Sequence, residues 1–374
     1  MRKKILIIAP NDKHLSSFMK HIHEIKDDNY IVDHFALSHH SNDDPFSEKF
    51  YIKKHFANIF YGKYLAFMTK YADLYLSFKK ITKSYDLINI HFVTIDSFFL
   101  LPLLKKKANK IMLTPWGSDA LRVSNKIIVN CLKILYGAAD YVSLADIRFR
   151  QDVINKFGFT QKKIVDLSYG ASMIDYIAEN PLSPTDAKKE IKLEDYFVMT
   201  VGYNRSPMQN HINIIAAVAA CKNKLPHNLI LLFPFTYNGS IEPYKSQLIE
   251  LLEKHQIKSI FYESFLENEK LNNIIYAADV FIHMQESDAN SASLQEYILA
   301  GKTVINGSWL KYDQLEKISI PYYTAKDKNS IQATLQEVID NKFISKTEGY
   351  HADEIKKFGW KKKSIEWNQF YSQL

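Results

Sequence analysis

Short apolar runs alternate with longer stretches of helical periodicity along most of the chain. Runs of this length, bounded by polar and turn-forming residues, are typical of buried strands. The sequence predicts strands at 4–9, 30–36, 87–91, 111–114, 141–144, 164–167, 197–201, 229–233, 259–262, 280–283, 303–306 and 321–323. Helical periodicity occupies many of the intervals, for example 212–221, 246–255 and 270–277. This alternation predicts an α/β fold with parallel sheets covered by helices on both faces.

The number of strands is too large for one sheet of ordinary size. A chain of 374 residues also exceeds the length at which a single hydrophobic core stops growing. We therefore predict two Rossmann-like domains, the first spanning 1–178 and the second 188–350. The linker is placed at 179–187, where two prolines precede a charged helix, and an amphipathic aromatic helix ends the chain.

The composition is that of a globular protein, since hydrophobic residues make up 47% of the chain and charged residues 24%. Cys131 and Cys221 are the only cysteines, which fits a reducing cytoplasm and excludes a disulfide framework. The first apolar run is too short for a signal peptide, and no run of 18 or more apolar residues could span a membrane. These features predict a cytoplasmic protein.

The net charge of +7 is unevenly distributed. Between Phe50 and Lys83, seven lysines and several aromatic residues accompany a single acid, Asp73. A basic, aromatic helix can lie on an anionic membrane surface or bind RNA. It can equally present its aromatic residues to the core and its lysines to water. No RNA-binding signature is present, so we expect no nucleic-acid partner and keep the anionic membrane surface as a candidate partner.

Two carboxylates, Asp288 and Glu296, flank a run of small and hydroxyl residues. Ser291 or Ser293 can cap a helix that begins in this run. The exposed N–H groups and positive dipole end of such a helix form an anion site. Glu296 falls one to two turns into the helix, so the anion suggested is a nucleoside diphosphate with its ribose hydroxyls on Glu296. The alternative is an ordinary capped helix entering an α/β sheet.

Polar residues also follow the predicted strand 197–201. Arg205, Asn210 and His211 can all reach a phosphate at the start of the next helix, or they form a capping loop with a surface arginine. The candidate donor-binding residues are Gly202, Asn204, Arg205, Asn210, His211, Asn290, Ser291, Ala292, Ser293 and Glu296.

Several motifs resemble those of family 4-like GT-B glycosyltransferases. Segments 137–145, 156–159 and 164–170 are similar to the end of their N-terminal domain, and Val201-Gly202 opens the second domain as theirs does. Segment 276–282 leads into Asp288 and Glu296, which resemble their two-carboxylate motif. The resemblance implies two Rossmann-like domains facing across a cleft. It also implies that residues 355–374, which include the similar motifs at 358–360 and 367–371, cross back onto the N-terminal domain.

A narrower resemblance is to the bacterial 4-acetamido-4,6-dideoxygalactose (Fuc4NAc) transferase family. It is carried by segments 11–13 and 116–119, and by 201–204 with 210–211. The chain departs from the family 4 pattern where Asp288 replaces the usual Glu, and where Tyr203 and Gln209 or Asn210 stand in place of Arg and Lys. Trp116 replaces a common His. These departures leave open whether the reaction inverts or retains the anomeric configuration.

Trp116-Gly117-Ser118-Asp119 follows the strand 111–114, at the carboxyl edge where α/β sheets bind ligands. Gly117 permits close backbone approach. Asp119 is the first candidate for the general base that an acceptor hydroxyl requires, or it caps a helix. Asp12, in the loop after the first strand, is the alternative base or another cap, and Asp288 would face the sugar. The candidate acceptor-binding residues are Asn11, Lys13, His14, Trp116, Gly117, Ser118 and Arg122.

The resemblance implies transfer of a sugar from a nucleotide-sugar donor to a glycan or polyprenyl-linked glycan in bacterial surface polysaccharide or lipopolysaccharide synthesis. The enzyme would be peripheral on the inner face of the cytoplasmic membrane. An Asp-x-Asp metal motif is missing, and we interpret His39, His40, Asp43 and Asp44 as a solvated loop, so no metal or other cofactor is expected. A nucleotide-sugar 2-epimerase of the same fold and a catalytically idle partner module remain alternatives.

Overall fold

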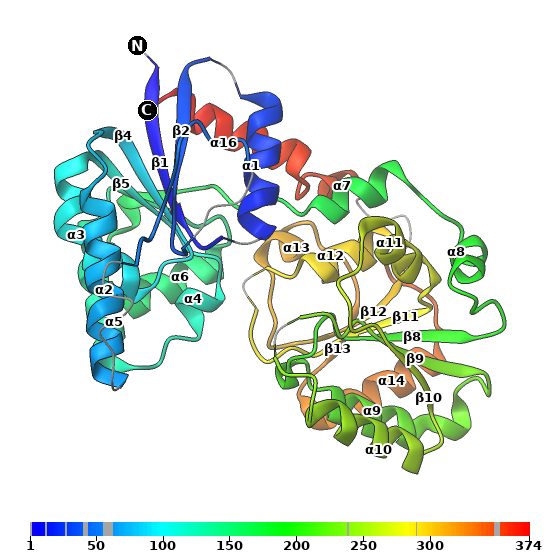
Figure 1. Cartoon of the computed structure of the whole chain (residues 1–374). Coiled ribbons are helices and arrows are strands. Elements are labelled where there is room, and N and C mark those ends of the chain that lie inside the picture. Colours follow the sequence, from blue (N-terminus) through cyan, green and yellow to red (C-terminus); the bar gives the residue numbers. More distant parts are fainter. Residues whose placement is uncertain are drawn as a thin grey trace. The chain divides into compact units, whose positions relative to one another are not determined.

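The computed structural model describes residues 2–11, 13–26, 28–39, 44–54, 63–237, 239–288, 290–347 and 352–374; the side chains of residues 13, 14 and 63–67 are outside this description. The chain forms two compact units (Figure 1). Unit 1 comprises residues 1–170 and 360–374, and unit 2 comprises residues 171–359. The chain passes between them at Gly170–Ala171 and Gly359–Trp360, so the linker predicted at 179–187 falls inside unit 2.

Unit 1 is built on one sheet of seven parallel strands in the order β3-β2-β1-β4-β5-β6-β7. Its strands are β1 (Lys3–Ala9), β2 (Tyr30–Ala36), β3 (Lys49–Tyr51), β4 (Tyr85–His91), β5 (Ala108–Thr114), β6 (Tyr141–Ser143) and β7 (Ile164–Val165). Only β3 was not predicted. It is a half-exposed edge strand of sequence Lys-Phe-Tyr, which contains no apolar run.

The helices of unit 1 are α1 (Lys13–Ile25), α2 (Lys63–Lys79), α3 (Ile95–Lys107), α4 (Ser118–Leu121), α5 (Lys126–Ala138), α6 (Ile147–Phe157) and α16 (Trp360–Ser372). Helix α1 packs against α16, whereas α2, α3, α5 and α6 pack one against the next. From β1 to β2 the chain moves toward one edge of the sheet, and from β4 to β7 it moves toward the other edge. Because crossover connections are right-handed, α1 lies on one face of the sheet and α2, α3, α5 and α6 lie on the other.

Unit 2 has a sheet of six parallel strands in the order β10-β9-β8-β11-β12-β13. These are β8 (Phe197–Val201), β9 (Leu229–Phe233), β10 (Lys258–Phe261), β11 (Val280–His283), β12 (Thr303–Gly307) and β13 (Tyr323–Ala325). The two parallel sheets confirm the predicted fold class, and each predicted strand overlaps an observed one.

Helices cover both faces of this second sheet. One core contains side chains of α9 (His211–Cys221), α10 (Tyr244–Lys254) and α14 (Ile331–Asp340). The other contains side chains of α7 (Ser172–Glu179), α8 (Pro184–Glu190), α11 (Asn268–Ala277), α12 (Ala292–Leu299), α13 (Asp313–Lys317) and α15 (Ala352–Lys356). Within the part of the chain that the structure describes, every helix is too short or too polar to traverse a bilayer.

The last helix completes the core of unit 1. Trp360, Trp367 and Tyr371 of α16 are buried in one cluster with Phe18 of α1. The indole N–H of Trp367 donates to the carbonyl of Ser168 over 2.9 Å, and its ring meets Phe18 edge-on at 5.1 Å between centroids. In Figure 1 the red C-terminal helix accordingly lies beside the blue α1. Helix α16, with which the chain returns to unit 1, is therefore part of the fold of that unit.

We predict that Trp367→Ala destabilises unit 1 by about 3–5 kcal/mol, because it leaves a cavity in this core and an unpaired carbonyl at Ser168. Urea unfolding followed by circular dichroism measures the loss. The matched control is Ile365→Ala on the same helix, where the side chain is 41% exposed. Equal stability of the two variants would show that α16 contributes little to the core.

Candidate functional site

The predicted donor residues of unit 2 gather at the carboxyl ends of neighbouring strands. Strand β8 has β9 on one side and β11 on the other, so the strand order reverses at the β8–β11 pair. Open α/β sheets bind ligands outside the carboxyl ends of their strands at this kind of switch point. The segment after β8 carries residues 202–211, and the segment after β11 leads through Asp288 into α12.

Helix α12 begins as the small-residue run predicts. Ser291, rather than Ser293, is its N-cap, and its hydroxyl accepts a hydrogen bond from the N–H of Leu294 over 3.2 Å. Ala292 and Ser293 form the first turn, and the amide oxygen of Asn290 accepts a hydrogen bond from the side chain of Gln295. One donor of the first turn is thus satisfied by the cap, while the positive end of the helix remains directed toward the strand ends.

A buried histidine holds this helix start in place. Nδ1 of His283, the last residue of β11, lies 2.8 Å from Oδ1 of Asn306 in β12. Its Nε2 lies 3.2 Å from the Ser291 hydroxyl and 3.9 Å from the Asp288 carboxylate. Burial lowers the pKa of His283, so the ring is neutral, donates from Nδ1 to Asn306 and accepts at Nε2. Two strands are thereby joined to the N-cap of α12.

Glu296 is buried in the second turn of α12. Burial raises the pKa of its carboxyl group to about 7. No hydrogen bond or charge among the described residues offsets this effect of burial. Tyr237, in the segment after β9, is close enough that the Glu296 charge raises the pKa of its hydroxyl, in addition to the larger effect of burial. A carboxylate in this setting can accept hydrogen bonds from ligand hydroxyls.

A network of side chains joins the two segments that follow β8 and β11 at their carboxyl ends. The Tyr203 hydroxyl donates to Oε1 of Gln285 and lies 3.4 Å from the Asp288 carboxylate. The same Gln285 oxygen accepts from the side chain of Gln209 over 2.6 Å. Gly202 has a φ of +61°, and a Cβ there would come within 2.9 Å of the Gln209 amide. Tyr203 and Gln209 stand in place of the Arg and Lys of the family 4 pattern. Their neutral side chains therefore stabilise this loop through hydrogen bonds to Gln285.

The other predicted phosphate ligands after β8 are mostly engaged in packing. Asn210 donates from Nδ2 to the carbonyl of Met284 over 2.5 Å, and the hydroxyl of Tyr244 lies 3.0 Å from Nδ1 of His211. Burial lowers the pKa of His211 to about 3, so this ring is neutral. The side-chain oxygen of Asn204 accepts from the N–H of Ser206 over 2.9 Å. These contacts shape the loop.

Arg205 is the cation of this loop. Its Nη2 donates to the carbonyl of Thr236, which ties the segment after β8 to the segment after β9. Its Nε is buried and has no acceptor within the described residues. A buried guanidinium donor without an acceptor costs free energy that an anionic ligand would recover.

In unit 1, Asp119 connects two loops. Its carboxylate accepts hydrogen bonds from the N–H groups of Val93, over 2.6 Å, and Trp116, over 2.8 Å. Burial raises the pKa of Asp119 to about 6, although these N–H donors lower it. Gly117, with a φ of +111°, is the N-cap of α4, and Ser118 begins that helix. Asp119 therefore fixes the ends of β4 and β5 relative to each other, and its role as a base stays a prediction.

The remaining acceptor candidates are less closely grouped. The Trp116 ring lies 5.4 Å from the ring of Tyr169, whose hydroxyl bonds to Nδ1 of His91. Asn11 is half-buried and Arg122 is exposed. Asp12 lies outside the described residues, as do the side chains of Lys13 and His14.

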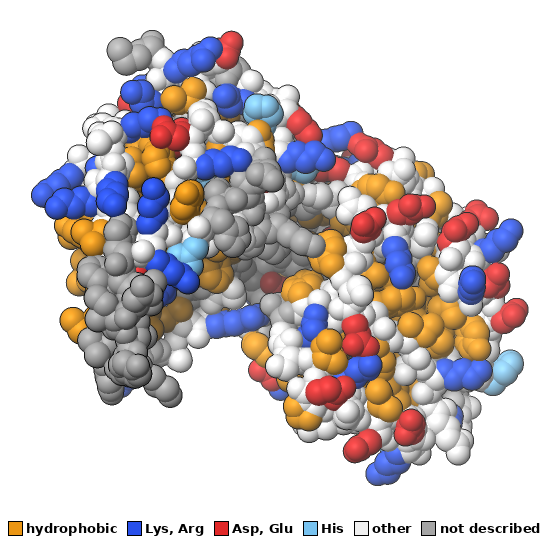
Figure 2. All heavy atoms as spheres, in the orientation of Figure 1, with side chains coloured by type: hydrophobic (Ala, Val, Ile, Leu, Met, Phe, Trp, Pro, Cys, Tyr) orange, Lys and Arg blue, Asp and Glu red, His pale blue; other side chains and the backbone are white. Residues whose placement is uncertain are grey.

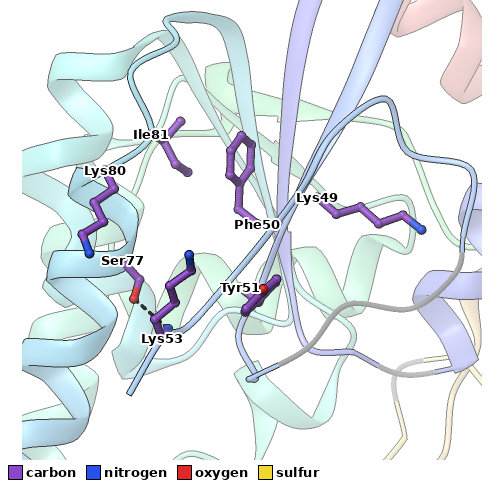
Figure 3. Close-up of a pocket in the computed structure, with 7 residues that line it drawn as sticks. All are labelled: Lys49, Phe50, Tyr51, Lys53, Ser77, Lys80 and Ile81. Carbon is purple, nitrogen blue, oxygen red and sulfur yellow. Dashed lines mark hydrogen bonds between the residues drawn. The ribbon is translucent and has the colours of Figure 1, made fainter. Parts of the chain in front are cut away.

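A separate pocket of about 220 Å³ lies in unit 1 between β3 and the end of α2 (Figure 3). Its lining residues are Lys49, Phe50, Tyr51, Lys53, Ser77, Lys80 and Ile81. The backbone N–H of Lys53 donates to the Ser77 hydroxyl over 2.9 Å. None of the predicted site residues contributes to this pocket.

His283, Gln285 and Tyr237 are candidate site residues that the sequence patterns did not reveal. A signal existed for the first two, since both are polar and stand at the end of an apolar strand. Tyr237 carries no comparable signal, because its strand is followed by aromatic residues whose side-chain directions depend on tertiary packing. Among the described residues, no group of three or more His, Cys, Asp or Glu side chains is arranged to hold a metal ion.

No protein-family model matches the sequence, and comparison with curated proteins finds no significant match. Among solved structures, sucrose-phosphate synthase from Thermosynechococcus elongatus matches with a TM-score of 0.73 at 15% identity, covering 100% of this chain and 99% of that one. Anabaena HepE in complex with UDP and glucose matches with a TM-score of 0.73 at 13% identity, covering 100% of both chains. A glycosyltransferase from Rickettsia africae gives a TM-score of 0.70 at 13% identity, covering 100% and 98%.

These likenesses establish the architecture. The chain has the GT-B fold, with two Rossmann-like units, as the family 4-like resemblance implied. The narrower Fuc4NAc transferase resemblance gains no support from these structures.

We predict that Glu296→Gln stabilises the ligand-free protein at high pH. The pKa of Glu296 in the folded chain, about 7, exceeds the ordinary value of 4.5, so the folded state holds the proton more tightly than the unfolded state. This contribution is complete below pH 4.5 and is lost as the pH rises through 7. Above pH 7 the buried charge costs up to about 3 kcal/mol, which Gln avoids.

Thermal unfolding at several pH values measures this effect. The Tm of the variant should exceed that of the original protein at pH 8, with the difference vanishing toward pH 5. The control is Glu250→Gln on α10, an exposed glutamate in the same unit. If the difference in Tm between Glu296→Gln and the original protein did not depend on pH, ionisation of Glu296 would not destabilise the folded state.

Proposed function

We propose that this protein is a glycosyltransferase that moves a sugar from a nucleotide-sugar donor to a glycan or polyprenyl-linked glycan. The observation that carries the proposal is the combination, at the β8–β11 switch point, of a fixed helix start and a buried glutamate one to two turns further on. Phosphate groups suit the first feature and ribose hydroxyls suit the second. Anabaena HepE, which shares the fold, has been solved in complex with UDP and with UDP-glucose.

The proposed donor site meets the leaving-group charge without a metal ion. Tyr203 and Gln209 supply no positive charge, so the diphosphate would be stabilised by the N–H groups of α12 and by Arg205, whose Nε is a buried donor. Asp288 would face the sugar, oriented by Tyr203 and by the nearby His283. Metal-independent catalysis and the absence of other cofactors are parts of this proposal.

On the acceptor side, we propose Asp119 as the base, with Asp12 as the alternative. Its raised pKa supports this assignment, because a carboxylate with a pKa nearer to neutrality is a better proton acceptor. The acceptor is proposed to be a lipid-linked glycan of bacterial surface polysaccharide synthesis. The enzyme would then act as a peripheral protein at an anionic membrane surface.

Nucleotide binding tests the donor assignment. Calorimetric titration with UDP, GDP, dTDP and CMP identifies the preferred base. With that base, Glu296→Ala should weaken the affinity roughly 10- to 100-fold, the loss expected for hydrogen bonds to a charged group. The original protein should bind the nucleotide that lacks the 2′-hydroxyl more weakly than the ribonucleotide. The Glu296→Ala variant should bind these two nucleotides with equal affinity.

Glu250→Ala, which alters an exposed glutamate of the same unit, should leave the affinity unchanged. Unaltered affinity of Glu296→Ala would remove the ribose assignment. Failure of all nucleotides to bind would contradict the proposed function as a whole. Conversion of the donor to an epimer without acceptor would favour the 2-epimerase, and binding without any turnover would favour an idle partner module.

A further inference from the structure

Residues 55–62 of the lysine-rich segment, and the side chains of residues 63–67, lie outside the described residues, so the predicted membrane contact of this segment is described only in part. In the described part, several side chains contact the rest of unit 1. Phe78 is buried against Phe35, with 5.1 Å between ring centroids. Lys83 pairs with the buried Asp33 over 3.0 Å. Lys53 and Lys80 line the pocket of Figure 3. Among the described residues of this unit, a continuous basic and apolar face lies on other helices.

Helix α5 presents such a face. Ile127 and Ile134 are 74% and 58% exposed, and a spacing of seven residues places them on the same side of the helix. Lys126 and Lys133 are exposed directly beside them. The helix contains no acidic residue. Exposed isoleucines flanked by lysines are the pattern of a helix that lies in the interface of an anionic bilayer.

The neighbouring helix α3 extends this face. It packs against α5 and exposes Pro102, Lys105 and Lys106. Its one acid, Asp96, is paired with Lys70 of α2 over 2.8 Å. Figure 2 shows Lys and Arg side chains gathered with hydrophobic side chains on the unit that carries these helices. The charge of the two helices is therefore strongly positive.

We propose that the outer surface of α3 and α5 docks on an anionic phospholipid bilayer, with Ile127 and Ile134 entering the headgroup region. The charge of this surface indicates which partner it binds. Two copies of the chain would bring like charges together on this surface, whereas anionic headgroups complement the lysines. The inference rests on the proposed function, because docking brings the enzyme to a lipid-linked acceptor, and it places the contact on different helices from the segment 50–83.

Vesicle flotation of the full chain tests this proposal. The probes are vesicles of phosphatidylcholine alone and of phosphatidylcholine mixed with phosphatidylglycerol. The protein should float only with the mixed vesicles, and less at high salt. Lys126→Gln with Lys133→Gln should weaken this binding about fivefold per lysine, and Ile127→Glu with Ile134→Glu should weaken it at least about tenfold.

Matched controls come from unit 2. Ile344→Glu changes an isoleucine that is 64% exposed, and Lys189→Gln with Lys254→Gln removes two exposed lysines; neither should alter flotation. Nucleotide binding, a property proposed for unit 2, should be the same in every variant. It therefore separates a failure of docking from a failure of the proposed function or of folding.

Three results would overturn the proposal. The first is equal flotation of the Ile127→Glu, Ile134→Glu variant and the original protein. The second is loss of flotation only when Lys53, Lys54, Lys79 and Lys80 are changed to Gln, which would return the contact to the segment 50–83. The third is no binding to mixed vesicles together with a change of oligomeric state in the isoleucine variant, which would make this surface a protein interface.

Discussion

The neutral ring of His283 makes the interaction on which the candidate site depends. It bonds to Asn306 on one side and to the N-cap residue Ser291 on the other. Because both partners are polar and buried, the orientation of the ring is determined, and with it the start of α12. A helix N-terminus becomes a selective anion site only when its direction is fixed. The β11–β12 pair thus supplies rigidity, and α12 supplies the N–H groups and the dipole.

Glu296 contributes to the candidate site in the opposite way to His283, whose ring is satisfied by hydrogen bonds within the protein. Its carboxylate is withdrawn from water, no cation among the described residues offsets this, and burial raises its pKa to about 7. Such a group weakens the fold when ionised and strengthens the binding of a ligand that donates hydrogen bonds to it. The site therefore holds unfavourable electrostatics that a ligand can relieve. The buried Nε of Arg205 has the same character with opposite charge.

Much of the fold could be predicted because buried parallel strands are continuous apolar runs, and β1 and β9 are clear examples. Strand β3 escaped prediction because an edge strand needs no such run. The start of α12 was predictable from local capping chemistry, with Ser291 or Ser293 as the expected cap, and the structure has Ser291. The boundary at Gly170–Ala171 was not, because the packing of α7 and α8 in unit 2 depends on tertiary contacts, whereas the prolines at 179–187 favoured a linker there.

The candidate site was less predictable than the fold for a physical reason. Sequence reasoning assigned His211 and Asn210 to phosphate from their place after β8, yet their side chains bond to Tyr244 and Met284. The direction of a side chain is set by its tertiary neighbours, which no local pattern specifies. Tyr203 illustrates this well, since its hydroxyl reaches Gln285 and Asp288, more than eighty residues away.

The most direct measurement of the central claim is a crystal structure of the protein with a nucleoside diphosphate bound. The account predicts phosphate oxygens accepting hydrogen bonds from N–H groups in the first turn of α12, with the ribose hydroxyls on Glu296 and the His283 hydrogen bonds intact. A nucleotide bound away from this turn, or a helix start whose N–H groups other than that of Leu294 are occupied by protein side chains, would contradict it.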